Sequence, residues 1–167
     1  MTKKIKFTLL DKSQKSEILP LLFDIFYENT SKISSFSKTY EAERNEWLSE
    51  VSPALEKAPR QIILIYHGTD LAGFVMYYTR DELLMIEELQ LVPKYQRTLL
   101  CYKTVKYLYE FLGEKIERIE AYALKSNKIS IGLMQDLGFA KINDTLGTKF
   151  LHFSCDANKI KSKFSRK

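Results

Sequence analysis

The chain of 167 residues is 45% hydrophobic and contains 20 Phe and Tyr residues, which excludes a wholly disordered protein. Its formal net charge of +5 comes from the last nine positions, which hold five basic residues and no acid, whereas the other 21 basic residues equal the acidic ones in number. No stretch approaches the roughly 18 apolar residues that a membrane helix needs, and the N-terminus lacks the continuous apolar core of a signal peptide, so we expect a cytoplasmic protein.

The hydrophobic pattern predicts helices and strands in a mixed order. A strand comes first, and two helices follow it; Pro20 kinks the first helix or marks a second start, and Pro53 is expected to end or bend the second. In chain order, the predicted strands are 4–10, 61–66, 71–79, 83–92 and 116–124 with a final hairpin over 141–154 that turns near 144–147, and the predicted helices are 13–27, 38–56, 98–112 and 127–137.

Because the helices cluster unevenly between the strands, this order predicts a mixed α/β fold rather than a doubly wound nucleotide fold. We expect one domain over residues 1–156 and a basic tail over 157–167. The simplest interpretation of the tail is a frayed terminus. Nucleic acid is an unlikely partner, since Phe164 is the only aromatic residue among these basic positions.

The segment from Leu83 to Leu112 is the most informative one. A buried strand that carries Glu87 and Glu88 runs through the basic break Pro93–Arg97 directly into a helix. A strand that meets a helix N-terminus leaves several backbone N–H groups without partners, and these groups bind phosphate. An acid on the same strand would let binding and proton transfer share one cleft.

Two patterns lie in and after this segment. Residues 127–139 read Asn-x-x-Ser-x-x-x-Met-x-x-x-Gly-Phe, and residues 91–101 read Leu-Val-Pro-Lys-Tyr-Gln-Arg-Thr-Leu-Leu-Cys. They resemble the GNAT superfamily of acyl-CoA-dependent N-acyltransferases, whose patterns are Asn-x-x-Ala-x-x-x-Tyr-x-x-x-Gly-Phe and Pro-x-Tyr followed by Arg/Gln-x-x-Gly-x-Gly/Ala. The resemblance covers residues 60–154 well and the first 59 by element order only. It implies a mostly antiparallel central sheet flanked by helices on both faces.

The resemblance also implies acetyl-CoA as cosubstrate. The positions implied to bind it are Leu91, Gln96, Arg97, Thr98, Leu99, Leu100, Cys101, Asn127 and Met134. Leu99 and Cys101 occupy both glycine positions, and Leu99 adds a large side chain where the phosphates would lie. Three outcomes are possible for such a loop: it shifts and still binds the cofactor, it binds the cofactor weakly, or it has lost the binding site. Basic residues that could compensate by pairing with phosphates are Lys94, Arg97, Lys103 and Lys106.

Catalysis in the family is direct attack of an amine on the thioester within a splayed strand pair, with a carboxylate as base. Glu87 and Glu88 are expected on opposite faces of their strand. We favour Glu88 as the base because it shares a face with Ile86 and Gln90, although a structural ion pair would explain it equally well. Met134 occupies the position of the tyrosine that serves the family as general acid, and a thioether cannot donate a proton. Alternative donors are Tyr95, Tyr102 and Tyr122.

These observations predict an N-acyltransferase that transfers an acetyl group to an amine, either a small molecule or a protein N-terminus or lysine. Acids on the second helix, Glu41, Glu43 and Glu46, could attract a cationic acceptor. The alternative is a catalytically impaired GNAT-fold module for ligand sensing or protein interaction. A homodimer stays open. No metal site is predicted, because the two cysteines and two histidines form no ligand set, and Cys101 is disfavoured as a nucleophile by its place on an apolar stripe.

Overall fold

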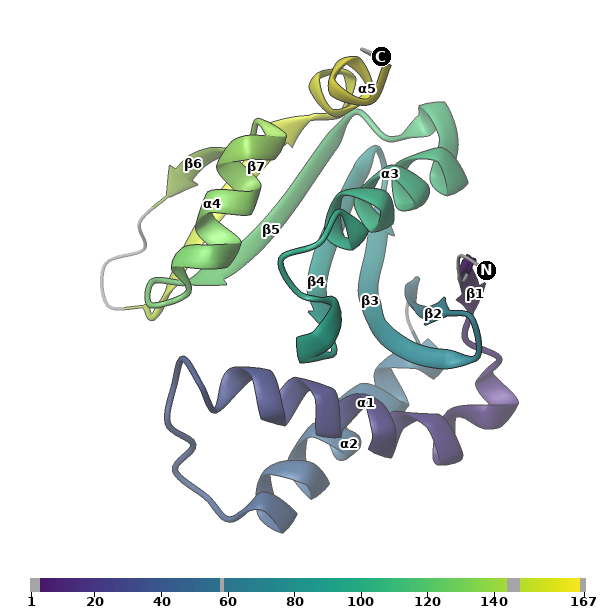
Figure 1. Cartoon of the computed structure of the whole chain (residues 1–167), viewed down its shortest axis with the longest axis vertical. Helices are drawn as coiled ribbons and strands as arrows, with labels where there is room; N and C mark the ends of the chain where they lie inside the picture. The colour runs from purple at the N-terminus through teal and green to yellow at the C-terminus, as the bar shows by residue number, and fades with distance from the viewer. Residues whose placement is uncertain (1–3, 58, 144–147, 166–167) are drawn as a thin grey trace. The chain divides into compact units, whose positions relative to one another are not determined.

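The computed structural model describes residues 4–57, 59–143 and 148–165 and confirms the predicted mixed α/β fold (Figure 1). A seven-stranded sheet has the order β1-β2-β3-β4-β5-β7-β6. The strands are β1 (Ile5–Leu9), β2 (Arg60–His67), β3 (Asp70–Arg80), β4 (Leu83–Leu91), β5 (Arg118–Leu124), β6 (Ala140–Asn143) and β7 (Phe150–Asp156). The helices are α1 (Lys15–Thr30), α2 (Tyr40–Lys57), α3 (Leu100–Leu112), α4 (Lys128–Leu137) and α5 (Ala157–Ser165). The pair β4–β5 is parallel, and β1–β2, β5–β7 and β6–β7 are antiparallel.

The chain divides into two compact units. The first unit comprises Met1–Tyr77 and Glu88–Thr98, and the second comprises Tyr78–Glu87 and Leu99–Lys167. Strands β3 and β4 therefore contribute residues to both units. The single domain expected over residues 1–156 stays a prediction, and the turn expected near 144–147 lies outside the described residues.

The core of the first unit forms between the two N-terminal helices and the strands. Apolar side chains of α1 and α2 pack with alternate residues of β2 and β3; the buried members are Leu19, Leu22, Val51, Leu55, Ile62, Leu64, Phe74 and Met76. The expectation that Pro53 could end its helix is wrong, because α2 continues to Lys57. Burial of Leu55 beyond the proline, at 3% exposure, offsets the helix bond that Pro53 removes.

The predicted helix ends at 112 and 137 are confirmed in the second unit, where caps close the helices. Asn127 is the N-cap of α4, with its side chain accepting from the Ser130 N–H at 3.0 Å, and Gly138 ends that helix in the left-handed conformation with φ 96°. Gly113 ends α3 with φ 74°. The predicted start of α3 at Thr98 is wrong: the helix begins at Leu100, after a separate turn.

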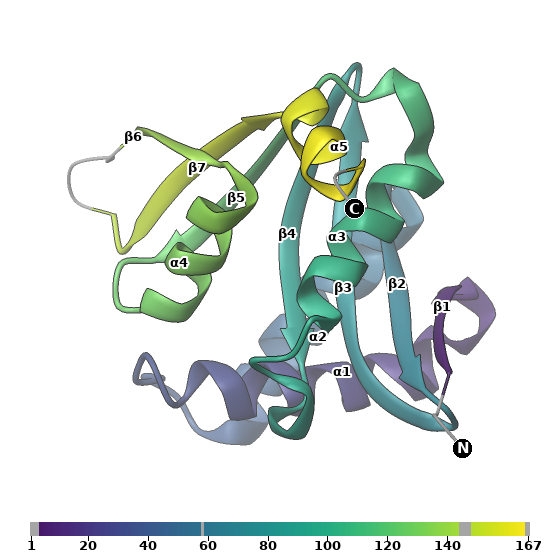
Figure 2. The ribbon, with the colours of Figure 1, turned by 45° about the horizontal axis from the view of Figure 1, so that its top comes forward.

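The frayed C-terminal tail expected from composition is also wrong over the described residues. Residues Ala157–Ser165 form α5, in which Ala157 and Ile160 are buried while Lys159, Lys161 and Lys163 are exposed. The helix packs against β7 and α3 (Figure 2). Burial of the apolar side of α5 stabilises the helix, although its basic composition alone suggests a disordered segment.

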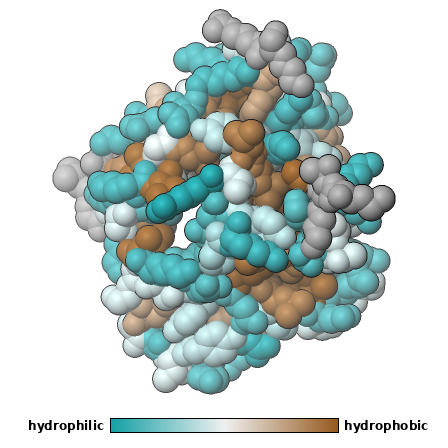
Figure 3. Space-filling view, in the orientation of Figure 1, coloured by the Kyte–Doolittle hydropathy of each residue, from teal (hydrophilic) through white to brown (hydrophobic). Residues whose placement is uncertain are grey.

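No helix in the described ranges is long and apolar enough to span a membrane. Apolar side chains reach the face drawn in Figure 3 in patches among hydrophilic ones. The most exposed large apolar residues of the described chain are Leu99, at 68%, and Ile129, at 60%.

Candidate functional site

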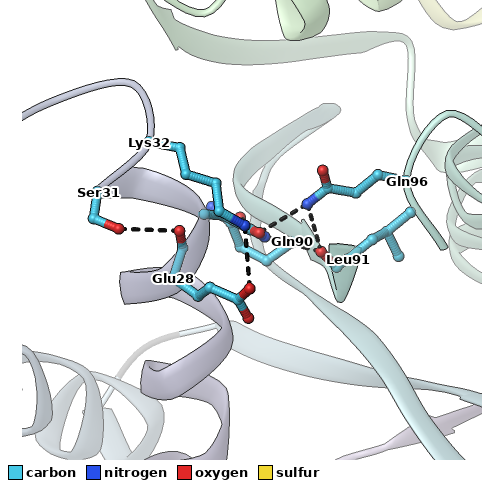
Figure 4. A network of polar contacts seen from close by, with 7 residues as sticks. Glu28, Ser31, Lys32, Gln90, Leu91 and Gln96 are labelled. Carbon is cyan, nitrogen blue, oxygen red and sulfur yellow. Dashed lines mark hydrogen bonds and ion pairs between the residues drawn. The ribbon is translucent and has the colours of Figure 1, made fainter. Parts of the chain in front are cut away.

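A network of side-chain amides lies at the end of β4 in the first unit (Figure 4). Asn29, near the end of α1, donates from Nδ2 to Gln90 Oε1 at 3.0 Å and to the Leu91 carbonyl at 2.9 Å. Gln96 donates from Nε2 to the same carbonyl at 2.9 Å and to Asn29 Oδ1 at 2.7 Å. Gln90 in turn donates to Glu88 Oε2 at 2.8 Å.

This network uses the whole donor capacity of two amide groups. An amide nitrogen has two hydrogens and a carbonyl oxygen has two lone pairs, so the donors of Asn29 and Gln96 and the acceptor of Leu91 are fully engaged. Gln96, predicted to bind the cofactor, therefore fixes the end of β4 through its side chain. The Glu88–Gln90 bond also shows that these two residues share a face, as predicted.

Strand β3 approaches β4 very closely at the same place. A Cβ on Gly73 would lie 2.1 Å from the Gln90 carbonyl oxygen and 2.9 Å from Leu91 Cα. The Val92 N–H donates to the Ala72 carbonyl at 2.9 Å, which joins the two backbones. Only glycine leaves room for this approach, so the position of Gln90 and Leu91 depends on Gly73.

The segment after β4 is a turn rather than a direct entry into a helix. Pro93–Tyr95 form one 3₁₀ turn, and the Thr98 hydroxyl donates to the Tyr95 carbonyl at 2.7 Å. Asp70 accepts from Tyr95 at 3.3 Å and pairs with Lys94 at 3.4 Å, so one of the four predicted phosphate partners is engaged elsewhere. Arg97 has φ 57°, a left-handed conformation that is uncommon outside glycine.

The N-terminus of α3 lies in the second unit. Leu99 is its N-cap, and the first helical bond runs from the Lys103 N–H to the Leu99 carbonyl at 3.0 Å. The N–H groups of Cys101 and Tyr102 precede that bond and belong to the first turn, whose N–H groups have no carbonyl within the helix to bind. Leucine carries no atom that could cap them. The backbone of Leu99, with φ −69° and ψ 2°, is ordinary, so this glycine position does not need glycine's conformational freedom.

Cys101 is a poor nucleophile in this environment. Burial raises the pKa of its thiol to about 11, from a usual value of 9.0. The reactive thiolate is therefore scarce near neutral pH, in agreement with the sequence-based preference against this role.

Two further predicted cofactor residues belong to α4. Asn127 uses its side-chain oxygen as the helix cap. Met134 is only 7% exposed and packs in the interior of the second unit. Neither the cap nor the burial tests a contact with cofactor, which stays a prediction for both.

The candidate proton donors are all in contact with other groups. Tyr102 donates to Asp136 at 3.3 Å, and burial together with this carboxylate raises the pKa of Tyr102. Tyr95 donates to Asp70. Tyr122 stacks on His152 with ring centroids 4.3 Å apart. Of these rings, only that of Tyr122 belongs to a largely exposed side chain, at 49%.

A groove of about 550 Å³ lies between α1 and α2 in the first unit. Its lining includes Leu19, Pro20, Leu48 and Pro53 with several small polar side chains. The acids predicted to attract a cation are partly engaged by Lys38, which pairs with Glu46 at 2.6 Å and donates its N–H to Glu43 at 3.2 Å.

Sequence reasoning missed Asn29, which falls between the predicted helices 13–27 and 38–56. Its partners Gln90 and Leu91 lie 61 and 62 positions further along the chain. No period or motif connects such positions, so only the packing of α1 beside β4 identifies the contact.

A family model described as the acetyltransferase (GNAT) family matches residues 19–139. No curated protein sequence matches the chain. Among solved structures, an acetyltransferase from Thermus thermophilus is 16% identical with a TM-score of 0.73, covering 93% of this chain and 99% of that one. A PaiA N-acetyltransferase from Thermoplasma acidophilum in complex with coenzyme A is 14% identical with a TM-score of 0.71, covering 92% and 99%. Mutant forms of the spermidine/spermine N-acetyltransferase SpeG from Vibrio cholerae are 11% identical with a TM-score of 0.66, covering 96% and 98%. At these identities the structures show likeness of fold.

Proposed function

Since the chain belongs to the GNAT family of acetyltransferases, we propose that it transfers the acetyl group of acetyl-CoA to a primary amine by direct attack on the thioester. The observation that carries the proposal is the N-terminus of α3, where the N–H groups of Cys101 and Tyr102 precede the first helical bond. A helix start attracts phosphate through the N–H groups of its first turn and through its dipole. The cofactor's pyrophosphate would bind there.

The end of β4 supplies the catalytic groups in this proposal. Glu88 is held by Gln90, and its carboxylate, acting directly or through a water, accepts a proton from the acceptor ammonium. Glu87, which directly precedes Glu88 on the strand, is the alternative base. The neutral amine then forms a bond to the thioester carbon while the carbon–sulfur bond breaks, and the CoA thiolate leaves with a proton from the new amide nitrogen.

The absence of an acidic side chain at Met134 is compatible with this scheme. A CoA thiolate is a fair leaving group, so its departure does not require a tyrosine at that position. For the acceptor we propose an amine that is cationic before reaction. Spermidine is one suitable probe, because a structural neighbour is a spermidine/spermine N-acetyltransferase.

The anion site is tested with Leu99→Asp. Aspartate is a strong N-cap residue and would occupy the N–H groups of α3 with its own carboxylate, so the variant should be as stable as the parent or more so, while its acetyl-CoA affinity falls at least tenfold. Titration calorimetry measures the affinity, and thermal unfolding measures the stability. Leu21→Asp is the matched control: Leu21 is 48% exposed on α1, and the same change there should leave the affinity unchanged.

Turnover separates the enzyme from the alternative, a ligand-sensing module. Release of free CoA is measured with acetyl-CoA and three amines: spermidine, a lysine peptide and a peptide with a free N-terminus. Binding without release for all three would favour the sensing module. No binding at millimolar acetyl-CoA would contradict the proposed function itself. With a turning-over acceptor, Glu88→Gln and Glu87→Gln identify which carboxylate contributes.

A further inference from the structure

Glu120 is the one buried acid among the described residues, at 8% exposure. It lies on β5 in the second unit, and its two carboxylate oxygens have different partners. Oε1 is 2.9 Å from Arg118 Nε, and Oε2 is 2.9 Å from His152 Nε2. A carboxylate that is buried and paired on both oxygens fixes the groups that it contacts.

His152 is oriented from two sides. It lies on β7, directly opposite Tyr122 of β5 in the antiparallel ladder, and its ring stacks on that tyrosine at an interplanar angle of 14°. With the proton on Nε2, the imidazole donates to Glu120 and keeps its lone pair on Nδ1. The side chain of His152 is 17% exposed and Tyr122 is 49% exposed, so the pair is reachable from solvent.

The location of this pair in the second unit connects it with the proposed chemistry. The parallel ladder of β4 and β5 ends at Ile86 and Ala121, and the residues that follow on the two strands are Glu87 and Tyr122. Met85 is paired with Glu120, and side chains alternate along a strand, so Glu87 follows on the side of β4 that Met85 shares with Glu120. Glu87 and Tyr122 are therefore the residues that follow the end of this ladder on that side of the sheet, and Tyr122 is paired with His152.

We infer that His152 Nδ1, oriented by Glu120 and Tyr122, is the proton acceptor for the ammonium group of the acceptor substrate. The inference rests on the proposed function. In it, His152 takes the place of Glu88 or Glu87 as the group that finally holds the proton. The ammonium N–H bond breaks, the proton moves to Nδ1, and the resulting imidazolium is stabilised by the Glu120 carboxylate. The free amine then attacks the thioester, the CoA thiolate takes the second amine proton, and His152 returns its proton to solvent. Glu120 and Tyr122 are positioning residues.

Histidine suits this role because a neutral imidazole can hold one proton on Nε2 while Nδ1 accepts another. The charged and titratable groups on its side of the sheet come from β5, namely Arg118, Glu120 and Tyr122, and from β4, namely Glu87. On β6 the residue paired with it is Asn143, and Lys141 is paired with Phe153 on the opposite face.

The test compares the pH dependence of kcat/KM for spermidine in the parent and in His152→Gln, by CoA release. In the parent the value should depend on pH less steeply than in the variant. In His152→Gln only the free amine reacts, so kcat/KM should be about 100-fold lower at pH 7, and the deficit should shrink as pH rises toward the pKa of the amine. Acetyl-CoA affinity, measured by calorimetry, should be unchanged.

Two variants and one control complete the design. Added imidazole should restore part of the activity of His152→Ala, which a purely structural histidine would not show, and Glu120→Gln should lower kcat with little change in KM. His67→Gln removes the other histidine of the chain and should keep the parent profile. If His152→Gln keeps the parent rate and profile, this inference is wrong while the proposed function stands. If the parent releases no CoA with spermidine or either peptide, both are wrong.

Discussion

The close approach of β3 to β4 makes Gly73→Ala a sharp test of how the end of β4 is held. The new Cβ would lie 2.1 Å from the Gln90 carbonyl oxygen and 2.8 Å from Leu91 Cδ2, against an optimum of about 3.5 Å for such contacts. Because the nearest atom belongs to backbone, a side-chain rotation cannot relieve the clash. The strands must separate by about 1 Å, which breaks the 2.9 Å bond from the Val92 N–H to the Ala72 carbonyl.

The expected loss is about 3 kcal/mol of unfolding free energy. Overpacking contributes about 2 kcal/mol and the lost backbone bond about 1 kcal/mol. At a urea slope of about 2 kcal/mol per molar, the unfolding midpoint should fall by about 1.5 M. Displacement of the Leu91 carbonyl also disturbs its bonds from Asn29 and Gln96, so acetyl transfer should fall with stability.

The matched control is Gly132→Ala. Gly132 lies inside α4, and a Cβ there would meet no atom within 4 Å. The same added methyl group should raise stability by about 0.5–1 kcal/mol, because alanine favours helix more than glycine does. Equal effects of the two changes, or a Gly73→Ala variant as stable as the parent, would refute the close approach as the cause.

Three other predictions concern single residues. Asn127→Ala removes the cap of α4 and should lower stability by about 1 kcal/mol in urea unfolding, whereas Asn127→Asp should keep most of it. In a Cys155→Ser background, the raised pKa of Cys101, about 11, should make its alkylation by iodoacetamide at pH 8 about 100-fold slower in the folded than in the unfolded chain; equal rates would exclude the burial. Ile160→Ala should cost about 2–4 kcal/mol because that side chain is fully buried in α5, and a change below about 0.5 kcal/mol would restore the frayed tail.

Local signals in the sequence predicted the elements well where a residue has one strong preference. Asn127, Gly113 and Gly138 mark helix ends through capping and left-handed φ, and all three do so in the structure. Pro53 misled because its local effect is outweighed by burial of Leu55, which depends on packing between α2 and the strands. The tail misled for the same reason: its lysines are conspicuous, but Ala157 and Ile160 decide its structure.

The candidate site could be predicted only in part. The strand, the turn and the helix start follow from contiguous residues, so the sequence places Leu91, Gln96 and Leu99 near one another along the chain. The contacts of Asn29 with β4 and of Glu120 with His152 join residues 32 or more positions apart. Such pairs depend on which strands are neighbours and in which register, and no short pattern carries that information.

The missing glycines of the loop could impair phosphate binding in two ways, through backbone conformation and through side-chain volume. The structure argues against the first. Glycine serves a phosphate loop either by adopting a left-handed φ or by lacking a side chain. Leu99 has φ −69°, so the loop does not need the first property at that position; the left-handed residue is Arg97, with φ 57°. What remains is the volume of the Leu99 side chain, which is 68% exposed and makes no cap hydrogen bond. Cys101, at the second glycine position, lies inside α3 and therefore has a helical backbone. The loss of both glycines is no conformational objection to an anion site, and binding depends on whether a phosphate can be accommodated beside an exposed leucine.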